Sequence, residues 1–513
     1  MYVGLCAIKG LSGFFDFGKK EINHLIILYL VADVCCCEKI RTTTSPGFTD
    51  FVGIEMKIKT VKSEGLAHNS YILFDQDEAV VIDPRRDCEI YTELASEECA
   101  QIKCILETHR NEDYVIGSLE LQNLTEAEIG HSKALPFKYG ENNLADGDTL
   151  NIGGIKIKVL STPGHTNESL CYLVYPSQSV EATLVFTGDT LFAGSVGRTD
   201  LYGKTNQPAQ AVKLFNSLHE KLLSIGDYVL VYPAHGAGSI CGHGINGMEP
   251  TTIGYEKKTN PYLQMGREEF VRKVSSETLV VPRYFKRMEE YNLKGSPLLS
   301  ELAYPKPLSL LEFKEEMAKQ NMIIIDTRLP YAFAGSHIPD SQNLWLGGTS
   351  VYPGWILDTN QYLVFVLERP QDIDTVSPRF LRLGFDNMCG FLCGGMNEWQ
   401  EAGKPIRSFG TMSAMELKDR LGGGELLLLD VRDPLEWVDD GYVEGATRLF
   451  FADLPEKADS LPNDKPIAVM CSVGNRSSIA SSILERKGYQ NINNVLGGMT
   501  AWANLGYPTK KEV

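Results

Sequence analysis

Residues 105–118 read ILETHRNEDYVIGS, an apolar run that ends in a dense group of titratable side chains. Four other runs rich in β-branched residues also end at polar residues or just before them. These runs are EAVVID at 78–83, KIKVLST at 156–162, EATLVFTGD at 181–189 and DYVLVYPAH at 227–235. Short runs of this kind, separated by helical stretches, are typical of buried strands in an α/β fold. Because α/β folds place their chemistry at the ends of such strands, Asp189 and His235 are candidate site residues.

Four motifs follow one another over about 130 residues in an order that resembles the metallo-β-lactamase fold. They are THRNEDY at 108–114, STPGHT at 161–166, FTGDTLF at 186–192 and YPAHG at 232–236. The resemblance implies an αββα sandwich. The first motif departs from the family pattern THxHxDH, because Asn111 and Tyr114 occupy positions that are normally His.

In that fold two metal sites share one aspartate, here Asp189. The resemblance implies that the first site keeps His109, His165 and Asp189, a 2-His-1-carboxylate set with open positions that is typical of non-haem Fe(II) oxygenases. The second site keeps Asp113 and His235 but has a tyrosine in place of an imidazole. A neutral phenol, with a pKa of about 10, is a poor metal ligand at pH 7. We therefore expect one Fe²⁺ per chain and a vestigial second site, with Zn²⁺ as the alternative metal.

Further motifs resemble the persulfide dioxygenase branch of this fold and its bacterial fusions to rhodanese domains. They are GRTDLYG at 197–203, PAHGAGSICG at 233–242 and TTIGYEKKTNPYLQ at 251–264. The resemblance implies that Arg198 binds the carboxylate of a thiol substrate and that Cys241 lies close to the metal pocket on the substrate side. Two alternatives remain open, a metal-free remnant of the fold and a dinuclear hydrolase.

The last 200 residues contain an internal repeat. MIIIDTRLPYAF at 322–333 matches LLLLDVRDPLEW at 426–437, and GGMNEW at 394–399 matches GGMTAW at 497–502. The offsets are 104 and 103 residues, which indicates two tandem domains, because the repeats of solenoids are shorter. Each copy alternates strands and helices, so each is predicted to be a small α/β domain.

The second copy contains IAVMCSVGNRSS at 467–478, in which Cys471 ends a predicted strand and a helix is expected to begin near Ser477. Backbone N–H groups of such a loop, together with Arg476, are expected to lower the pKa of the thiol and to cradle an anionic persulfide. The loop resembles the active loop of the rhodanese family, and its C-x4-R length favours sulfur over the larger phosphate. The residues expected to bind the substrate are Ser472, Val473, Gly474 and Asn475.

In the first copy, Leu367 stands opposite Cys471, so this domain is expected to lack the nucleophile and to serve as a spacer or docking module. The predicted organisation is α/β and multi-domain. It consists of an extension over 1–55 that is disordered or not native, a metallo-β-lactamase-like domain over 56–295, a rhodanese-like domain without catalytic Cys over 300–405, and an active rhodanese domain over 406–513.

Composition excludes several classes of protein. The chain has 513 residues, of which 49 are Lys or Arg and 66 are Asp or Glu, so the net charge is −17. An acidic chain of this kind is not expected to bind nucleic acid or a membrane surface. Twelve Cys without paired spacing predict a reducing, cytoplasmic protein with reactive rather than disulfide-bonded thiols.

These features together predict an enzyme of sulfane-sulfur metabolism. The predicted activities are iron-dependent oxidation of a low-molecular-weight thiol persulfide to sulfite and transfer of persulfide sulfur at Cys471, with thiosulfate or sulfite as further substrates. The resemblance also implies a homo-oligomer. One alternative is a zinc-dependent thiolester hydrolase similar to glyoxalase II. The other is a sulfurtransferase whose degenerate metallo-β-lactamase domain only binds a substrate or partner.

Overall fold

This computed structural model describes residues 56–277, 279–424 and 426–511. The prediction for residues 1–55 therefore falls outside the described residues. From residue 56 onward the chain forms one domain with two six-stranded sheets, followed by two domains that each contain a five-stranded sheet. Within the described ranges, the helices include none that is long and apolar enough to cross a bilayer.

Two six-stranded sheets form the centre of the first domain, with strand orders β1-β2-β3-β4-β5-β6 and β14-β13-β10-β9-β8-β7. The first sheet contains β1 (Lys57–Ser63), β2 (His68–Asp75), β3 (Glu78–Ile82), β4 (Gln101–Leu106), β5 (Glu128–Ser132) and β6 (Asn142–Leu144). The second contains β7 (Thr149–Ile152), β8 (Ile155–Ser161), β9 (Leu170–Tyr175), β10 (Leu184–Gly188), β13 (Leu230–Pro233) and β14 (Thr251–Thr252). A hairpin of β11 (Leu191–Phe192) and β12 (Ser195–Val196) follows β10.

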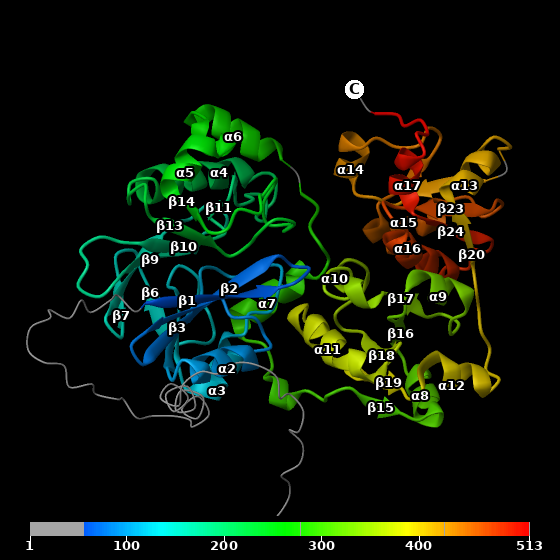
Figure 1. The fold of residues 1–513 in the computed structure, drawn as a ribbon, viewed down its shortest axis with the longest axis horizontal. Helices are drawn as coiled ribbons and strands as arrows, with labels where there is room; N and C mark the ends of the chain where they lie inside the picture. The colour runs from blue at the N-terminus through cyan, green and yellow to red at the C-terminus, as the bar shows by residue number, and fades with distance from the viewer. Residues whose placement is uncertain (1–55, 278, 425, 512–513) are drawn as a thin grey trace, which may run out of the picture. The chain divides into compact units, whose positions relative to one another are not determined.

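Alternation of side chains explains the layers, because successive residues of a strand face opposite sides of the sheet. Leu73 and Val80 of the first sheet share a buried cluster with Ile157 and Phe186 of the second, so the two sheets pack face to face. The opposite faces are covered by α2 (Glu89–Glu97) and α3 (Ser118–Thr125) on one side, and by α4 (Gln207–Asn216), α5 (Ile253–Thr259) and α6 (Arg267–Ser276) on the other (Figure 1). This is the expected αββα sandwich.

Each rhodanese-like domain is built on a five-stranded sheet, β15-β19-β18-β16-β17 in the first and β20-β24-β23-β21-β22 in the second. The first contains β15 (Lys306–Leu308), α8 (Leu310–Met317), β16 (Met322–Asp326), α9 (Pro330–Gly335), β17 (Gln342–Asn343), α10 (Pro353–Ile356), β18 (Tyr362–Val366), α11 (Ile373–Arg382), β19 (Met388–Leu392) and α12 (Gly395–Glu401). The second contains β20 (Gly410–Ser413), α13 (Ala414–Leu421), β21 (Leu427–Asp430), α14 (Pro434–Asp439), β22 (Thr447–Arg448), α15 (Leu454–Lys457), β23 (Ile467–Met470), α16 (Asn475–Arg486), β24 (Ile492–Leu496) and α17 (Gly498–Asn504).

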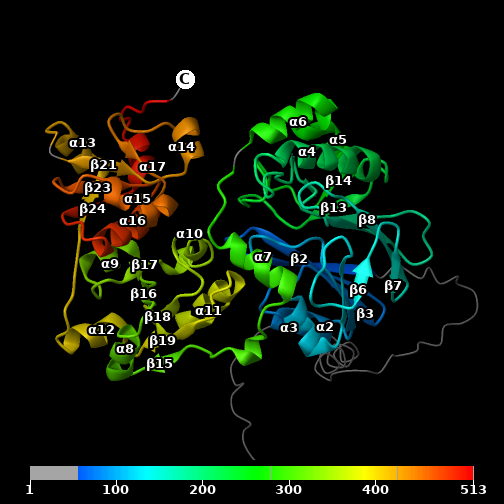
Figure 2. The ribbon, with the colours of Figure 1, turned by 180° about the vertical axis from the view of Figure 1, so that it is seen from behind.

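The strands of both five-stranded sheets are parallel, so the carboxyl ends of the central strands lie at one edge of each sheet. In the second of these domains, α16 packs on β23 and β24 (Figure 2). Helix α16 begins at Asn475, two residues before the expected start at Ser477. The loop between β23 and α16 is therefore only Cys471–Gly474, which brings Cys471 close to the amino end of the helix.

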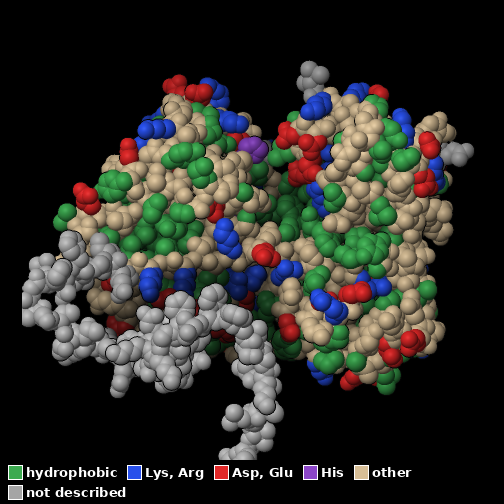
Figure 3. Space-filling view, in the orientation of Figure 1, with side chains coloured by type: hydrophobic (Ala, Val, Ile, Leu, Met, Phe, Trp, Pro, Cys, Tyr) green, Lys and Arg blue, Asp and Glu red, His purple; other side chains and the backbone are tan. Residues whose placement is uncertain are grey.

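The first rhodanese-like domain is tied to the preceding domain by α7 (Phe285–Lys294) and by buried ion pairs. Arg382 donates two hydrogen bonds of 2.7 Å to Asp87, and Arg86 lies 2.5 Å from Asp386. On the face shown in Figure 3, the Lys and Arg side chains of the described residues are interspersed with Asp and Glu.

Candidate functional site

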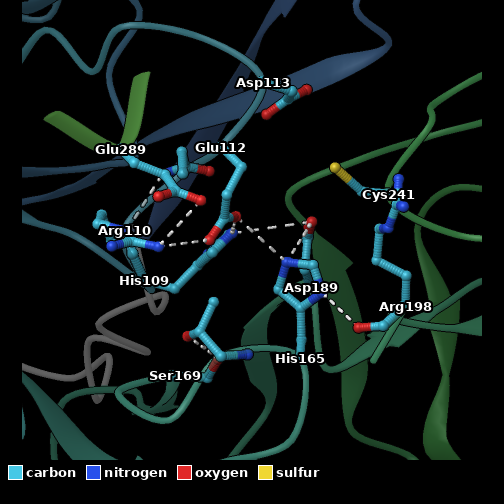
Figure 4. A network of polar contacts seen from close by, with 12 residues as sticks. His109, Arg110, Glu112, Asp113, His165, Ser169, Asp189, Arg198, Cys241 and Glu289 are labelled. Carbon is cyan, nitrogen blue, oxygen red and sulfur yellow. Dashed lines mark hydrogen bonds and ion pairs between the residues drawn. The ribbon is translucent and has the colours of Figure 1, made fainter. Parts of the chain in front are cut away.

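The predicted metal ligands come from loops that follow three different strands. His109 follows β4, His165 follows β8, and Asp189 directly follows β10. The structure brings these three buried side chains together, with one ligand atom of each lying within 4.8 Å of the others (Figure 4). Asp189 Oδ2 lies 3.8 Å from His109 Nε2 and 3.5 Å from His165 Nε2. One carboxylate oxygen and two imidazole nitrogens therefore face a common point.

Hydrogen bonds to the other ring nitrogen orient each imidazole. His109 Nδ1 lies 2.9 Å from Thr108 Oγ1, which in turn donates to Asp83 at 2.7 Å. His165 Nδ1 donates to the carbonyl oxygen of Arg198 at 2.9 Å. A partner on Nδ1 fixes the tautomer that leaves Nε2 free to bind a metal, as in many metal sites.

Burial and charge set the protonation of these groups. Burial lowers the pKa of His109 to about 4, so this imidazole is neutral at pH 7. Burial opposes the charge of Asp189, but the adjacent imidazoles outweigh it and hold the pKa of Asp189 below its usual value. For His165, burial favours the neutral form, whereas the carboxylates of Glu112 and Asp189 raise its pKa above the ordinary value. A proton on His165 would therefore compete with a metal as the pH falls.

The donor set fits a metal ion. His109 Nε2, His165 Nε2 and Asp189 Oδ2 are buried, and each lacks a hydrogen-bond partner among the described residues. Buried polar atoms are normally paired, so three unpaired ligand atoms that face one point fit a metal cation. Two imidazoles and one carboxylate suit Fe²⁺ or Zn²⁺.

In the second predicted site, the imidazole of His235 is hydrogen-bonded through both of its nitrogen atoms. His235 Nδ1 lies 2.7 Å from Asp189 Oδ1, and its Nε2 lies 2.8 Å from Asp113 Oδ2. Burial lowers the pKa of His235, but the two carboxylates overcome this and raise it well above the ordinary value. The Tyr114 ring stacks on His68 at 3.9 Å, and burial raises the pKa of its phenol well above the usual value. The phenol is thus even less suited to bind a metal than the sequence suggested.

Cys241 lies beside this second group rather than in the first. Its Sγ and the ligand atoms of Asp113 and His235 lie within 4.8 Å of one another. Burial raises the pKa of the Cys241 thiol well above its usual value. The resemblance implied a position near the metal pocket, and the structure adds that Cys241 is a third potential ligand at the second site.

Arg198, which is expected to bind a substrate carboxylate, is engaged with partners from the protein itself in this structure. Its side chain is buried and donates two hydrogen bonds to Asp200, at 2.7 and 2.9 Å. The remaining guanidinium donors reach the backbone carbonyls of Ile240, Leu279 and Val280. The guanidinium of Arg198 is hydrogen-bonded to all of these partners, so in this conformation it links three segments beside the site. To bind a substrate carboxylate, Arg198 would have to release Asp200.

The predicted persulfide loop places its backbone around Cys471. The thiol is buried, and the N–H of Gly474 donates to Cys471 Sγ at 3.1 Å. Gly474 has a φ of +109°, a conformation that a residue with a Cβ rarely adopts. Ser477 Oγ lies 3.4 Å from the sulfur. Of the expected loop residues, Ser472 contacts Arg476 rather than the sulfur, and Val473 is exposed.

Arg476 is paired with a carboxylate that the sequence argument missed. Its guanidinium donates to Glu436 at 2.5 and 2.7 Å. Burial opposes the charge of Glu436, but Arg476 lowers the pKa of that carboxyl to about 2. Part of the positive charge expected to act on Cys471 is therefore offset. Glu436 also accepts the N–H of Asp433 in a capping box at the start of α14. The Asp-x-x-Glu spacing of 433–436 is typical of such a helix start, so the sequence gives Glu436 a sufficient structural role.

Comparison with known proteins agrees with this architecture. The family described as the metallo-beta-lactamase superfamily matches residues 64–235, and the rhodanese-like domain family matches residues 309–402 and 413–505. The chain is thus a fusion of a metallo-beta-lactamase domain with two rhodanese-like domains.

Individual proteins resemble parts or most of this arrangement. A metallo-beta-lactamase structure from Staphylococcus aureus shares 28% identity with a TM-score of 0.58, covering 66% of this chain and 98% of that one. The mitochondrial persulfide dioxygenase of Bos taurus is 28% identical over 42% of this chain and 78% of its own length. A hydroxyacylglutathione hydrolase of Francisella philomiragia is 31% identical over 34% of this chain and 64% of its own length. The chain spans 45–46% of the length of four uncharacterized mycobacterial relatives.

Proposed function

We propose that the protein oxidises a low-molecular-weight thiol persulfide to sulfite and transfers persulfide sulfur at Cys471. The observation that carries the proposal is the set of ligand atoms on His109, His165 and Asp189 that face one another without hydrogen-bond partners among the described residues. Such 2-His-1-carboxylate sets serve non-haem Fe(II) oxygenases. The similarity to a persulfide dioxygenase supports the same chemistry.

The overall reaction is RSS⁻ + O₂ + H₂O → RSH + SO₃²⁻ + H⁺. Fe²⁺ bound by the triad would supply the activation of O₂. The protein contributes two oriented imidazoles and a carboxylate, all of them buried away from bulk water. His235 holds Asp189 by its other oxygen and so fixes the direction of the ligand oxygen.

Sulfur transfer would use the second rhodanese-like domain. The Cys471 thiolate attacks the outer sulfur of thiosulfate, the S–S bond breaks, and sulfite leaves while a cysteine persulfide remains. The Gly474 N–H, which now reaches Sγ, stabilises negative charge on the sulfur. In the reverse direction, the cysteine persulfide would pass its sulfur to sulfite made by the first domain. Linking the two domains raises the effective concentration of one product at the other site.

A second candidate function is zinc-dependent thiolester hydrolysis, which the similarity to a hydroxyacylglutathione hydrolase favours. Hydrolases of this fold usually use two metal ions. The engagement of His235 with Asp113 and Asp189 opposes a second ion, because a metal at that position would have to displace this imidazole from its hydrogen bonds.

Metal content separates the two functions. We expect the full chain, purified without oxygen and without added chelator, to contain about one iron and little zinc per chain, because His109, His165 and Asp189 form a 2-His-1-carboxylate set. The measurement is elemental analysis by mass spectrometry on protein of known concentration. Two zinc ions per chain would instead support the hydrolase.

A further inference from the structure

Glu112 lies in the loop between β4 and α3, three residues after His109, and the sequence argument gave it no role. Its side chain is 1% exposed. Its Oε2 atom has no hydrogen-bond partner among the described residues, as is also true of the three predicted ligand atoms. A buried carboxylate oxygen without a partner is costly, so it calls for a positive group that would pair with it.

The position of this oxygen mirrors that of Asp189. Glu112 Oε2 lies 3.9 Å from His109 Nε2 and 3.6 Å from His165 Nε2. The corresponding distances from Asp189 Oδ2 are 3.8 and 3.5 Å. Ligand atoms that bind one ion at about 2.0–2.2 Å lie about 3 to 4.4 Å apart, depending on the angle between them. Both carboxylates therefore stand at a spacing from the imidazoles that suits ligands of a common ion. Glu112 is not in the group whose ligand atoms all lie within 4.8 Å of one another, so the two carboxylates approach the imidazoles from different sides.

A neighbouring cation orients the Glu112 carboxylate. Arg110 donates to the other oxygen, Oε1, at 3.5 Å and also lies 3.6 Å from Glu289 (Figure 4). This contact engages Oε1 and leaves Oε2 directed toward the imidazoles.

From this geometry we propose that Glu112 Oε2 is a fourth protein ligand to the metal, beside His109, His165 and Asp189. The inference rests on the metal site of the proposed function. Asn111, the adjacent residue, cannot supply an imidazole, and its amide donates to the carbonyl oxygen of His109 instead. Glu112 replaces that lost donor with a carboxylate.

The added ligand changes the character of the site. Two neutral imidazoles and two carboxylates balance the charge of a divalent ion. Four protein ligands leave two positions of an octahedral ion open, whereas the triad alone leaves three. A higher share of oxygen donors favours Fe²⁺ or Mn²⁺ relative to Zn²⁺.

The test compares metal binding by the full chain and three variants under anaerobic conditions. Glu112→Gln keeps the size of the side chain but removes the anionic donor. Glu112→Asp keeps the carboxylate but shortens the side chain by one methylene, which moves the carboxylate away from the imidazoles. Glu289→Gln is the matched control, since Glu289 contacts Arg110 but not the imidazoles. Fe²⁺ affinity is measured by competition with a chelator, and the visible spectrum of the Co²⁺-loaded protein reports the coordination.

We expect Glu112→Gln to weaken Fe²⁺ binding at least about tenfold, to alter the Co²⁺ bands and to shift preference toward Zn²⁺, with Glu289→Gln unchanged. Unchanged affinity and spectrum in Glu112→Gln would overturn the proposal, even if O₂ uptake fell. Circular dichroism of the metal-free proteins checks folding, and Glu112→Asp decides the question by the same criteria if the Gln variant does not fold. Because no readout depends on persulfide oxidation, the ligand proposal and the proposed activity can fail separately.

Discussion

Replacing Asp189 by Ala is expected to remove most of the bound metal. Asp189 is the carboxylate of the predicted triad, and its Oδ2 lies within 3.8 Å of both imidazole nitrogens. Its loss takes away an anionic ligand and leaves His235 without one of its two acceptors. We expect iron content to fall to about one tenth of the wild-type value or less, measured by elemental analysis after dialysis.

Asp113→Ala is the matched control for this experiment. Asp113 is as deeply buried as Asp189 and also contacts His235, but it belongs to the other ligand group. Its loss is expected to reduce iron content much less, because the three triad atoms remain. If the Asp113 variant lost metal as completely as the Asp189 variant, the single-site interpretation would be wrong.

Cys471→Ser is expected to reduce thiosulfate:cyanide sulfurtransfer to background. The thiol is the nucleophile of the proposed transfer, it receives the Gly474 N–H, and a serine hydroxyl cannot form a persulfide. Oxygen-dependent persulfide oxidation is expected to survive at least in part, because the two chemistries use separate sites. Thiocyanate formation and O₂ uptake are measured on the same preparation.

Two further variants test the charge around this thiol. Arg476→Ala is expected to slow transfer, because it removes a cation and leaves Glu436 unpaired beside the loop. Glu436→Gln is the matched control. This variant keeps the positive charge of Arg476 and removes the negative charge that pairs with it, so we expect sulfur transfer to be largely retained. Full transfer activity in Cys471→Ser would refute the assignment of the nucleophile and direct attention to Cys241.

The fold could be predicted largely because its landmarks are local in sequence. Asp189 and His235 follow apolar runs that the structure forms as β10 and β13, and a strand that ends in a polar residue is visible without knowing its neighbours. The tandem repeat likewise needed only a comparison of the chain with itself. The expected assembly of His109, His165 and Asp189 came from the family resemblance, and the structure brings their ligand atoms together.

Side-chain contacts of the site residues could not be predicted from local sequence patterns. The pairing of Arg476 with Glu436 joins positions 40 residues apart, and Glu436 already has a sufficient local explanation as a capping residue. Arg198 is committed to Asp200 and to backbone carbonyls of remote loops, which no spacing indicates. Glu112 lies within the motif THRNEDY, but only the geometry shows that one of its oxygens faces the imidazoles.

The most direct test of the account is O₂ uptake by the iron-loaded full chain supplied with glutathione persulfide. The account predicts consumption of O₂ with about one sulfite formed per O₂, as the balanced reaction requires, and no such uptake by protein loaded with Zn²⁺, which has no redox chemistry. Absence of persulfide-dependent O₂ uptake by protein that contains one iron per chain would contradict the central claim.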